Sequence, residues 1–164
     1  MRSEDAPMIE IRNILFPTDF SDFSAYAASF AIAFARDYGA KLHVLHVLEL
    51  PFGMPEAFAL KVSENELREK TRELAQKELE SAATPETLRE LAYEFACLKG
   101  KPFVEIIKFA RDKKIDMIVM GTHGRSAVES AVLGSTSEKV VRKAPCPVLT
   151  VRRPGHRFIM PAVG

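Results

Sequence analysis

The chain of 164 residues has the usual size of one domain, and it is long enough to bury a full core without disulfides or metals. Its 23 basic and 22 acidic residues leave a net charge of +1, which creates no field that would attract nucleic acid. No apolar stretch reaches the roughly 20 residues of a spanning helix, and the acidic N-terminus does not fit a signal peptide. We therefore expect a cytoplasmic protein that binds neither nucleic acid nor a membrane.

The first 48 residues have the pattern of a strand, a helix and a second strand. The apolar run 11–16 ends at the turn residues 17–19, which is typical of a buried strand followed by a loop. A helix should follow, capped at residue 21 or 22 and stopped by Gly39. Residues 41–48 are mostly apolar and predict the second strand.

The middle of the chain combines a loop, a long helix and an ambiguous segment. Residues 49–62 contain Pro and Gly without a clear period, which predicts a loop that could lie over a site. The capping box Ser63-x-x-Glu66 starts a charged helix that ends near Ala83, and its Lys/Glu-rich face predicts a solvated surface. Residues 91–98 fit a third strand, although the acidic residues around them would also suit a helix.

The last part of the chain continues the alternation of helix and strand. Pro102 opens a helix that runs through residue 114, and residues 115–120 have the continuous apolar character of a buried parallel strand. Ser135-x-x-Glu138 predicts the cap of another helix, and residues 147–151 predict the last strand.

This alternation predicts an α/β fold: a single-domain, doubly wound sheet of five parallel strands with helices on both faces. We expect this sheet to be Rossmann-like, with strand order 3-2-1-4-5. We expect this domain to span residues 10–152, between an N-terminal arm (1–9) and a C-terminal tail (153–164) that are both poorly ordered.

Two segments follow predicted strands at the edge where such sheets bind ligands. Thr18 and Asp19 come directly after the first strand, where they serve either the turn alone or a ligand. Gly121 and Gly124 follow the fourth strand, and they would let backbone N–H groups approach an anion closely. Arg125 would add compensating positive charge, so the second segment suits a phosphate.

A further glycine stands at the predicted start of a helix, in the run Gly134-Ser135-Thr136. Free N–H groups at Gly134 and Ser135, with the positive end of the helix dipole, would face the same anion. The motif is not a Walker A loop, because GxxxxGK[ST] is absent, and it is not a dinucleotide fingerprint, because GxGxxG is absent after the first strand.

The spacing G-x2-G-x9-G-[ST] resembles the ATP-binding signature of the universal stress protein family. It is filled by Gly121, Gly124, Gly134 and Ser135. Four other segments resemble the family in the same order, so that the likeness extends over about residues 10 to 152. They are ILFPTD at residues 14–19, LHV at 45–47, GKP at 100–102 and CPV at 146–148.

The resemblance implies an ATP site with two ends. The adenine and ribose would be lined by Pro17, Thr18, Asp19, Val47, Met120 and Gly121. The phosphates would be held by Gly124, Arg125, Gly134, Ser135 and Thr136. Mg²⁺ or Mn²⁺ would bridge the phosphate oxygens instead of sitting in a dedicated protein cage.

The histidines and cysteines carry weaker signals. His123 could be catalytic, but it has no acidic or nucleophilic partner at recognisable spacing, which favours loop packing or a phosphate contact. His43 and His46 lie three apart on a strand and should point to opposite faces, so they cannot easily share a metal. Cys97 and Cys146 belong to no metal motif. No metal site formed by the protein alone is predicted.

These features predict an ATP-binding regulatory module of the stress response. Hydrolysis should be slow or absent, because Arg125 and backbone amides supply charge stabilisation but no base or positioned water can be named. The alternatives are a weak ATPase or nucleotidyl-transfer enzyme, and a nucleotide-free dimeric interaction module, which the intact glycine signature argues against.

The resemblance also implies a homodimer through the last strand, Val148–Val151. The apolar edge of that strand would otherwise be exposed. The sequence identifies no client protein.

Overall fold

A computed structural model describes residues 9–49, 63–123 and 133–154 of the chain. Residues 1–8 of the predicted arm, residues 50–62 of the predicted loop over the site, the predicted phosphate residues Gly124 and Arg125, and the tail from residue 155 lie outside the described residues. The described elements are, in chain order, β1 (Asn13–Pro17), α1 (Asp22–Tyr38), β2 (Lys41–Leu48), α3 (Glu64–Ala82), α4 (Pro85–Glu90), β3 (Tyr93–Lys99), α5 (Pro102–Asp112), β4 (Met117–Gly121), α6 (Ser135–Lys143) and β5 (Val148–Val151).

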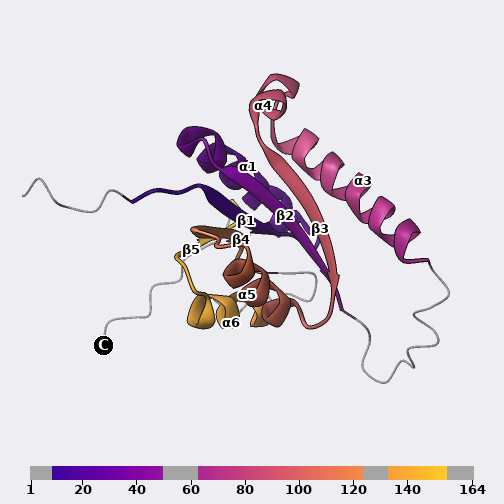
Figure 1. The fold of residues 1–164 in the computed structure, drawn as a ribbon, viewed down its shortest axis with the longest axis vertical. Coiled ribbons are helices and arrows are strands. Elements are labelled where there is room, and N and C mark those ends of the chain that lie inside the picture. The colour runs from indigo at the N-terminus through magenta and orange to yellow at the C-terminus, as the bar shows by residue number, and fades with distance from the viewer. Residues whose placement is uncertain (1–8, 50–62, 124–132, 155–164) are drawn as a thin grey trace, which may run out of the picture.

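The strands form one five-stranded sheet in the order β3-β2-β1-β4-β5, and every neighbouring pair is parallel (Figure 1). The predicted fold class and strand order are therefore confirmed. The order reverses between β1 and β4, because the chain leaves β1 toward β2 on one side and later returns to place β4 on the other. This reversal creates the crevice at which doubly wound sheets bind ligands.

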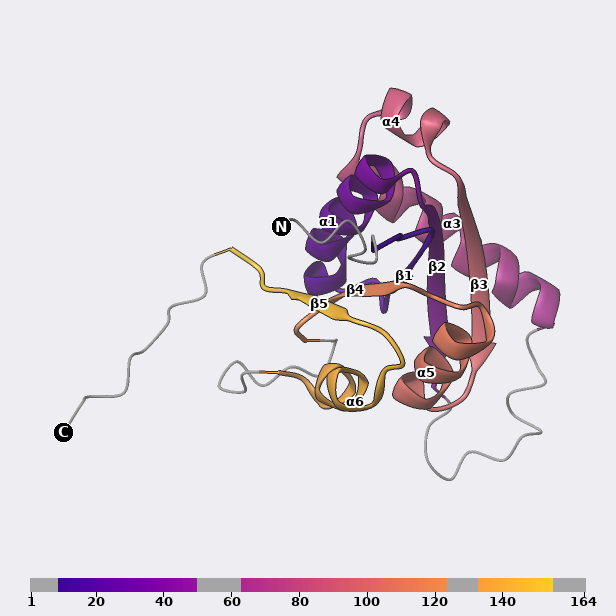
Figure 2. The ribbon, with the colours of Figure 1, turned by 60° about the vertical axis from the view of Figure 1, so that its left-hand side comes forward.

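Helices cover both faces of the sheet. Figures 1 and 2 show α1 and α3 on one face and α5 and α6 on the other. The side chains of β1 alternate accordingly: Ile14 and Phe16 belong to the core under α1 and α3, whereas Leu15 belongs to the core under α5 and α6. All three side chains are fully buried.

The helix caps follow from the residues at the turns. Ser21 caps α1 by accepting a hydrogen bond from the Ser24 N–H, and Gly39 ends that helix in the left-handed conformation, with φ of 62°. Ser63 caps α3 by accepting from the Glu66 N–H, as the capping box predicts. Within the described ranges, no helix combines the length and apolar character needed to cross a membrane.

Two features of the fold differ from the sequence predictions. The short helix α4 was not predicted, although Thr84 caps it and Pro85 occupies its first turn. The predicted cap at Ser135 is wrong, because Gly134 is the N-cap of α6 and no side-chain hydrogen bond caps it. The ambiguous segment after α4 is the strand β3, which pairs with β2 along its whole length.

Candidate functional site

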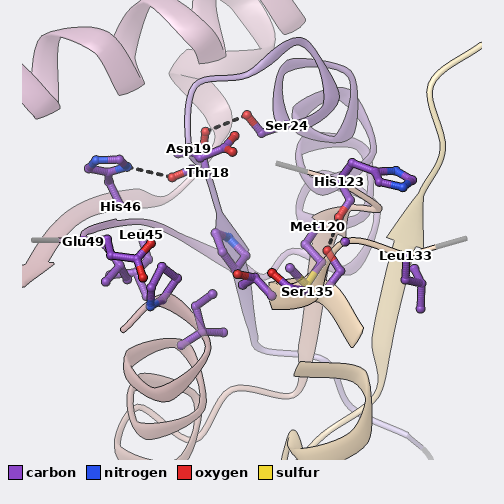
Figure 3. A pocket seen from close by; sticks show the side chains of 18 of the residues that line it. Thr18, Asp19, Ser24, Leu45, His46, Glu49, Met120, His123, Leu133 and Ser135 are labelled. Atoms are coloured by element: carbon purple, nitrogen blue, oxygen red, sulfur yellow. Dashed lines mark hydrogen bonds between the residues drawn. The ribbon is translucent and has the colours of Figure 1, made fainter. Parts of the chain in front are cut away.

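A cavity of about 500 Å³ lies at the carboxyl ends of β1, β2 and β4, beside the point where the strand order reverses (Figure 3). The N-terminus of α6 borders it, and α5 begins at the same edge of the sheet. Its volume falls within the range of about 300–1,000 Å³ that is usual for small-molecule sites.

The predicted site residues within the described ranges all border this one cavity. They come from three strand ends and one helix start that are distant in sequence: Pro17, Thr18, Asp19, Val47, Met120, Gly121, His123, Gly134, Ser135 and Thr136. The parallel arrangement brings them together, because the carboxyl ends of β1, β2 and β4 meet at one edge.

Further residues border the cavity that the sequence analysis did not assign to it. They are Ser24, Leu45, His46, Leu48, Glu49, Pro102, Ile106, Leu133 and Ser137. Pro102 and Ile106 belong to the first turns of α5, and the Gly-x-Pro segment before that helix was the available signal for them. Ser24 lies in the first turn of α1, and the remaining residues lie within two positions of predicted site residues, so adjacency in the sequence was their signal.

The turn between β1 and α1 is held by bonds within itself. The Thr18 hydroxyl accepts from the Phe20 N–H at 3.0 Å, and an Asp19 carboxylate oxygen accepts from the Ser21 N–H at 3.0 Å. Phe20 adopts a φ of 60°, which is unusual for a residue with a large side chain. A turn that contains such a strained residue persists only where the surrounding structure constrains it.

His46 provides one of these constraints from β2. Its Nδ1 donates to the Thr18 carbonyl at 2.9 Å, and its ring packs against Phe20 with a centroid separation of 4.7 Å. His43 lies on the opposite face of the sheet, where its ring contacts Glu94 at 2.8 Å and packs against Phe109 of α5. The two histidines therefore point to opposite faces, as predicted.

Glu78 of α3 provides another constraint, across a long distance in sequence. Its buried carboxylate accepts from the Thr18 hydroxyl at 2.7 Å and from the Ser24 hydroxyl at 3.0 Å (Thr18 and Ser24 are labelled in Figure 3). Burial raises the pKa of the Glu78 carboxyl, the hydrogen bonds from Thr18 and Ser24 oppose this shift, and the charge of Asp19 adds to it.

The sequence analysis missed Glu78, although a signal was present. Thr71, Ala75 and Glu78 are buried at helical spacing on one side of α3, with Leu79 beside them. An acidic residue beside the buried Ala75 and Leu79 indicates a buried polar contact.

Gly121 is the last residue of β4 and lies close to the first turn of α1. A Cβ at this position would lie 2.9 Å from the Phe23 carbonyl oxygen, which is closer than real Cβ atoms approach. Its φ is not in the left-handed region, so the backbone conformation does not require glycine here. The close approach of the first turn of α1 does require it.

The start of α6 is tied to the end of β4. The Gly134 N–H donates to the Thr122 carbonyl at 2.7 Å, and the Ser137 hydroxyl donates to the Gly121 carbonyl at 2.9 Å. The prediction of a free N–H at Gly134 is therefore wrong. The helix still directs the positive end of its dipole and the Ser135 and Thr136 side chains toward the cavity rim.

His123 is half-buried at the edge of the cavity. Its Nδ1 lies 3.0 Å from the Thr122 hydroxyl, and its ring packs against Phe23 of α1 with a centroid separation of 5.4 Å. These contacts fit a packing role. Among the residues that the structure describes, no group of three or more His, Cys, Asp or Glu side chains could hold a metal ion by itself.

Comparison with known proteins identifies related sequences over nearly the whole chain. A profile described as the universal stress protein family matches residues 10–152. A universal stress protein of Thermus aquaticus is 39% identical over 141 residues, which cover 86% of this chain and 98% of that protein.

Solved structures show the same fold. The structure of MJ0577 from Methanocaldococcus jannaschii is 31% identical, has a TM-score of 0.68, and aligns over 90% of this chain and 99% of its own. A universal stress protein of Archaeoglobus fulgidus was solved in complex with dAMP. It is 22% identical, has a TM-score of 0.58, and aligns over 87% of this chain and 98% of its own.

Proposed function

Because the chain belongs to the universal stress protein family, we propose that its cavity binds ATP and that the protein is a nucleotide-dependent regulatory module of the stress response. The observation that carries the proposal is the convergence of residues from β1, β2, β4 and α6 on one cavity of about 500 Å³. The dAMP complex of the Archaeoglobus protein supports it, because that protein has the same fold and binds an adenine nucleotide.

The two ends of the cavity suit the two ends of ATP. Val47, Ile106 and Met120 supply apolar surface for the adenine, and Asp19 supplies a carboxylate that could accept hydrogen bonds from the ribose hydroxyls. The start of α6 supplies a positive helix end and the Ser135 hydroxyl for the phosphates. Gly124 and Arg125 would complete the phosphate end, as the family signature implies.

A divalent cation would accompany the triphosphate. Apart from Asp19, which is assigned to the ribose, Glu49 is the acidic residue among the described residues that border the cavity, and its carboxylate oxygens are ligands of the kind that Mg²⁺ and Mn²⁺ prefer. One acidic residue suits a cation that is held mainly by phosphate oxygens and water. When bound, the cation would neutralise phosphate charge.

Hydrolysis in this site should be slow or absent. A general base near the γ-phosphate is needed to activate water, and His123, the residue closest to that role by type, packs against Phe23 beside Thr122. We therefore assign the bound nucleotide a regulatory role.

The regulatory module would be a homodimer formed through β5. This strand is at one edge of the sheet and pairs with β4 on its other side. Pairing of two β5 strands would satisfy the backbone groups of the exposed edge.

The test is isothermal titration of the full chain with ATP and Mg²⁺, followed by an assay of phosphate release. We expect saturable binding with little or no turnover. Gly124→Val should abolish ATP binding while the circular dichroism spectrum stays unchanged, because a branched side chain would occupy the position of the phosphates. Ala127→Val, which adds the same side chain outside the glycine signature, is the matched control. Normal ATP binding by Gly124→Val would refute the placement of the phosphates.

A further inference from the structure

The structure links the cavity to α3 through one buried side chain. Glu78 does not border the cavity, yet its carboxylate contacts the hydroxyls of Thr18 and Ser24, which do. We infer that Glu78 is a positioning residue for the nucleoside end of the cavity, which holds the turn after β1 in the shape that binds ligand. This inference rests on the proposed ATP-binding function.

The turn needs an external support because of its own conformation. Phe20, with its φ of 60°, follows the two residues that face the cavity, and the Thr18 hydroxyl is the group that accepts the Phe20 N–H. The same hydroxyl donates to Glu78 at 2.7 Å. Glu78 therefore fixes the rotamer of the side chain that stabilises the left-handed residue.

The supports come from two independent elements. His46 of β2 binds the Thr18 carbonyl, and Glu78 of α3 binds the Thr18 hydroxyl. Asp19 therefore directly follows a residue, Thr18, whose main chain and side chain are both held in place. A binding group that is fixed before the ligand arrives gives higher affinity than one that must be ordered on binding.

Burial of Glu78 is not explained by stability alone. A carboxylate with 8% of its surface exposed is in an unfavourable environment, and its raised pKa has burial as the largest cause. Its two hydrogen-bond donors both belong to the wall of the cavity, which is what a positioning role requires.

The removal of Glu78 should leave a folded protein. In its absence the Thr18 hydroxyl can donate to Ser24 at 3.0 Å, and the Ser24 hydroxyl can donate to the Ser21 carbonyl at 3.0 Å. Both hydroxyls keep a partner within the turn, while the connection to α3 is lost. Glu78→Met, which keeps the length of the side chain without its polar atoms, is therefore the informative variant.

The experiment compares the affinities of the wild type and three variants for ATP and for AMP by isothermal titration. Glu78→Met should weaken binding of both nucleotides by about tenfold, because the turn would then have to be ordered when the ligand binds. The factor should be the same for ATP and AMP, because the turn faces the nucleoside. Glu78→Gln, which can still bond both hydroxyls, should restore affinity to within about threefold of the wild type.

The control is Thr71→Val, which removes another buried polar group of α3 two helical turns earlier. Thr71 contacts Cys97 of β3 instead of the turn, so its loss should leave both affinities unchanged. Wild-type affinity in Glu78→Met, or an equal loss in Thr71→Val, would overturn the positioning role. If the wild type bound neither nucleotide, the proposed function itself would fail, and this inference with it.

Discussion

Glu78 makes the stability of the protein depend on pH. The folded state keeps the proton of this carboxyl at pH values where the unfolded chain, with an ordinary pKa of 4.5, has released it. The contribution of Glu78 to stability therefore falls as pH rises from the unfolded pKa through the raised folded pKa. Above both values the full penalty for a buried charge is present.

We predict that Glu78→Gln becomes progressively more stable relative to the wild type as pH rises, since the amide carries no charge at any pH. Urea denaturation at a series of pH values from about 4 to 8 measures this difference in the free energy of unfolding. A difference that does not change with pH would contradict the prediction.

Glu94 provides a control of opposite sign. Its pKa is lowered, mainly by the hydrogen bond from Lys41 and also by that from His43. Its stabilising contribution is present above the unfolded pKa and is lost as pH falls. Glu94→Gln should therefore be less stable than the wild type at neutral pH, and the gap should close in acid.

The close contact between Gly121 and α1 leads to a second prediction. Gly121→Ala should lower the free energy of unfolding by about 1–3 kcal/mol, because the new methyl group would push α1 away from β4. It should also weaken ATP binding, since the cavity lies where these elements meet. Thermal denaturation and isothermal titration measure the two effects.

Gly39→Ala is the matched control for that substitution. It meets no atom within 4 Å and strains only the left-handed cap of α1, at the end of the helix away from the cavity. It should lower stability without changing nucleotide affinity. Equal effects of both substitutions on affinity would show that Gly121 has no special role.

At the scale of elements, the sequence was most informative where hydrophobic pattern and capping residues agree. The apolar run of β4, the Ser21 cap and the Gly39 stop each predicted an element that the structure contains. The two errors have local causes. The helix α4 is too short to show a period, and Ser135 could not be distinguished from Gly134 as a cap because either residue is favoured there.

The candidate site was predictable for the same reason that the fold was. Once the strands are parallel, residues that end β1 and β4 must meet, so Asp19 and Gly121 could be grouped from the sequence, whereas Val47 was assigned by the resemblance to the family. The partners in contacts between the helices and the sheet could not be predicted from the sequence. The bond from Glu78 to Thr18 depends on how α3 packs over the sheet, and the glycine at 121 depends on how closely α1 approaches.

At the scale of the whole molecule, the exposed edge of β5 leads to a prediction about assembly. The Pro147 carbonyl accepts a hydrogen bond from Ile118 of β4, and the Val151 carbonyl accepts one from Thr122 directly after it. Strand alternation therefore directs the backbone N–H of Thr150 to the free edge. Thr150→Pro removes this donor and leaves the pairing with β4 in place.

We predict that Thr150→Pro is a monomer and that the wild type is a dimer, as measured by light scattering after size exclusion. Thr150→Val keeps the N–H and should remain dimeric. If the wild type were monomeric, or if Thr150→Pro stayed dimeric, β5 would not be the dimer interface.

The pairing of β1 with β4 also determines when the cavity can exist during synthesis. Ile14 of β1 aligns with Met117 of β4. The β1 side of the cavity therefore leaves the ribosome long before the β4 side is made. A nucleotide can stabilise only a conformation that already binds it. If the cavity binds a nucleotide as proposed, the nucleotide cannot stabilise a partly synthesised chain that contains β1 and β2 alone, and its protection begins only when β4 has been made.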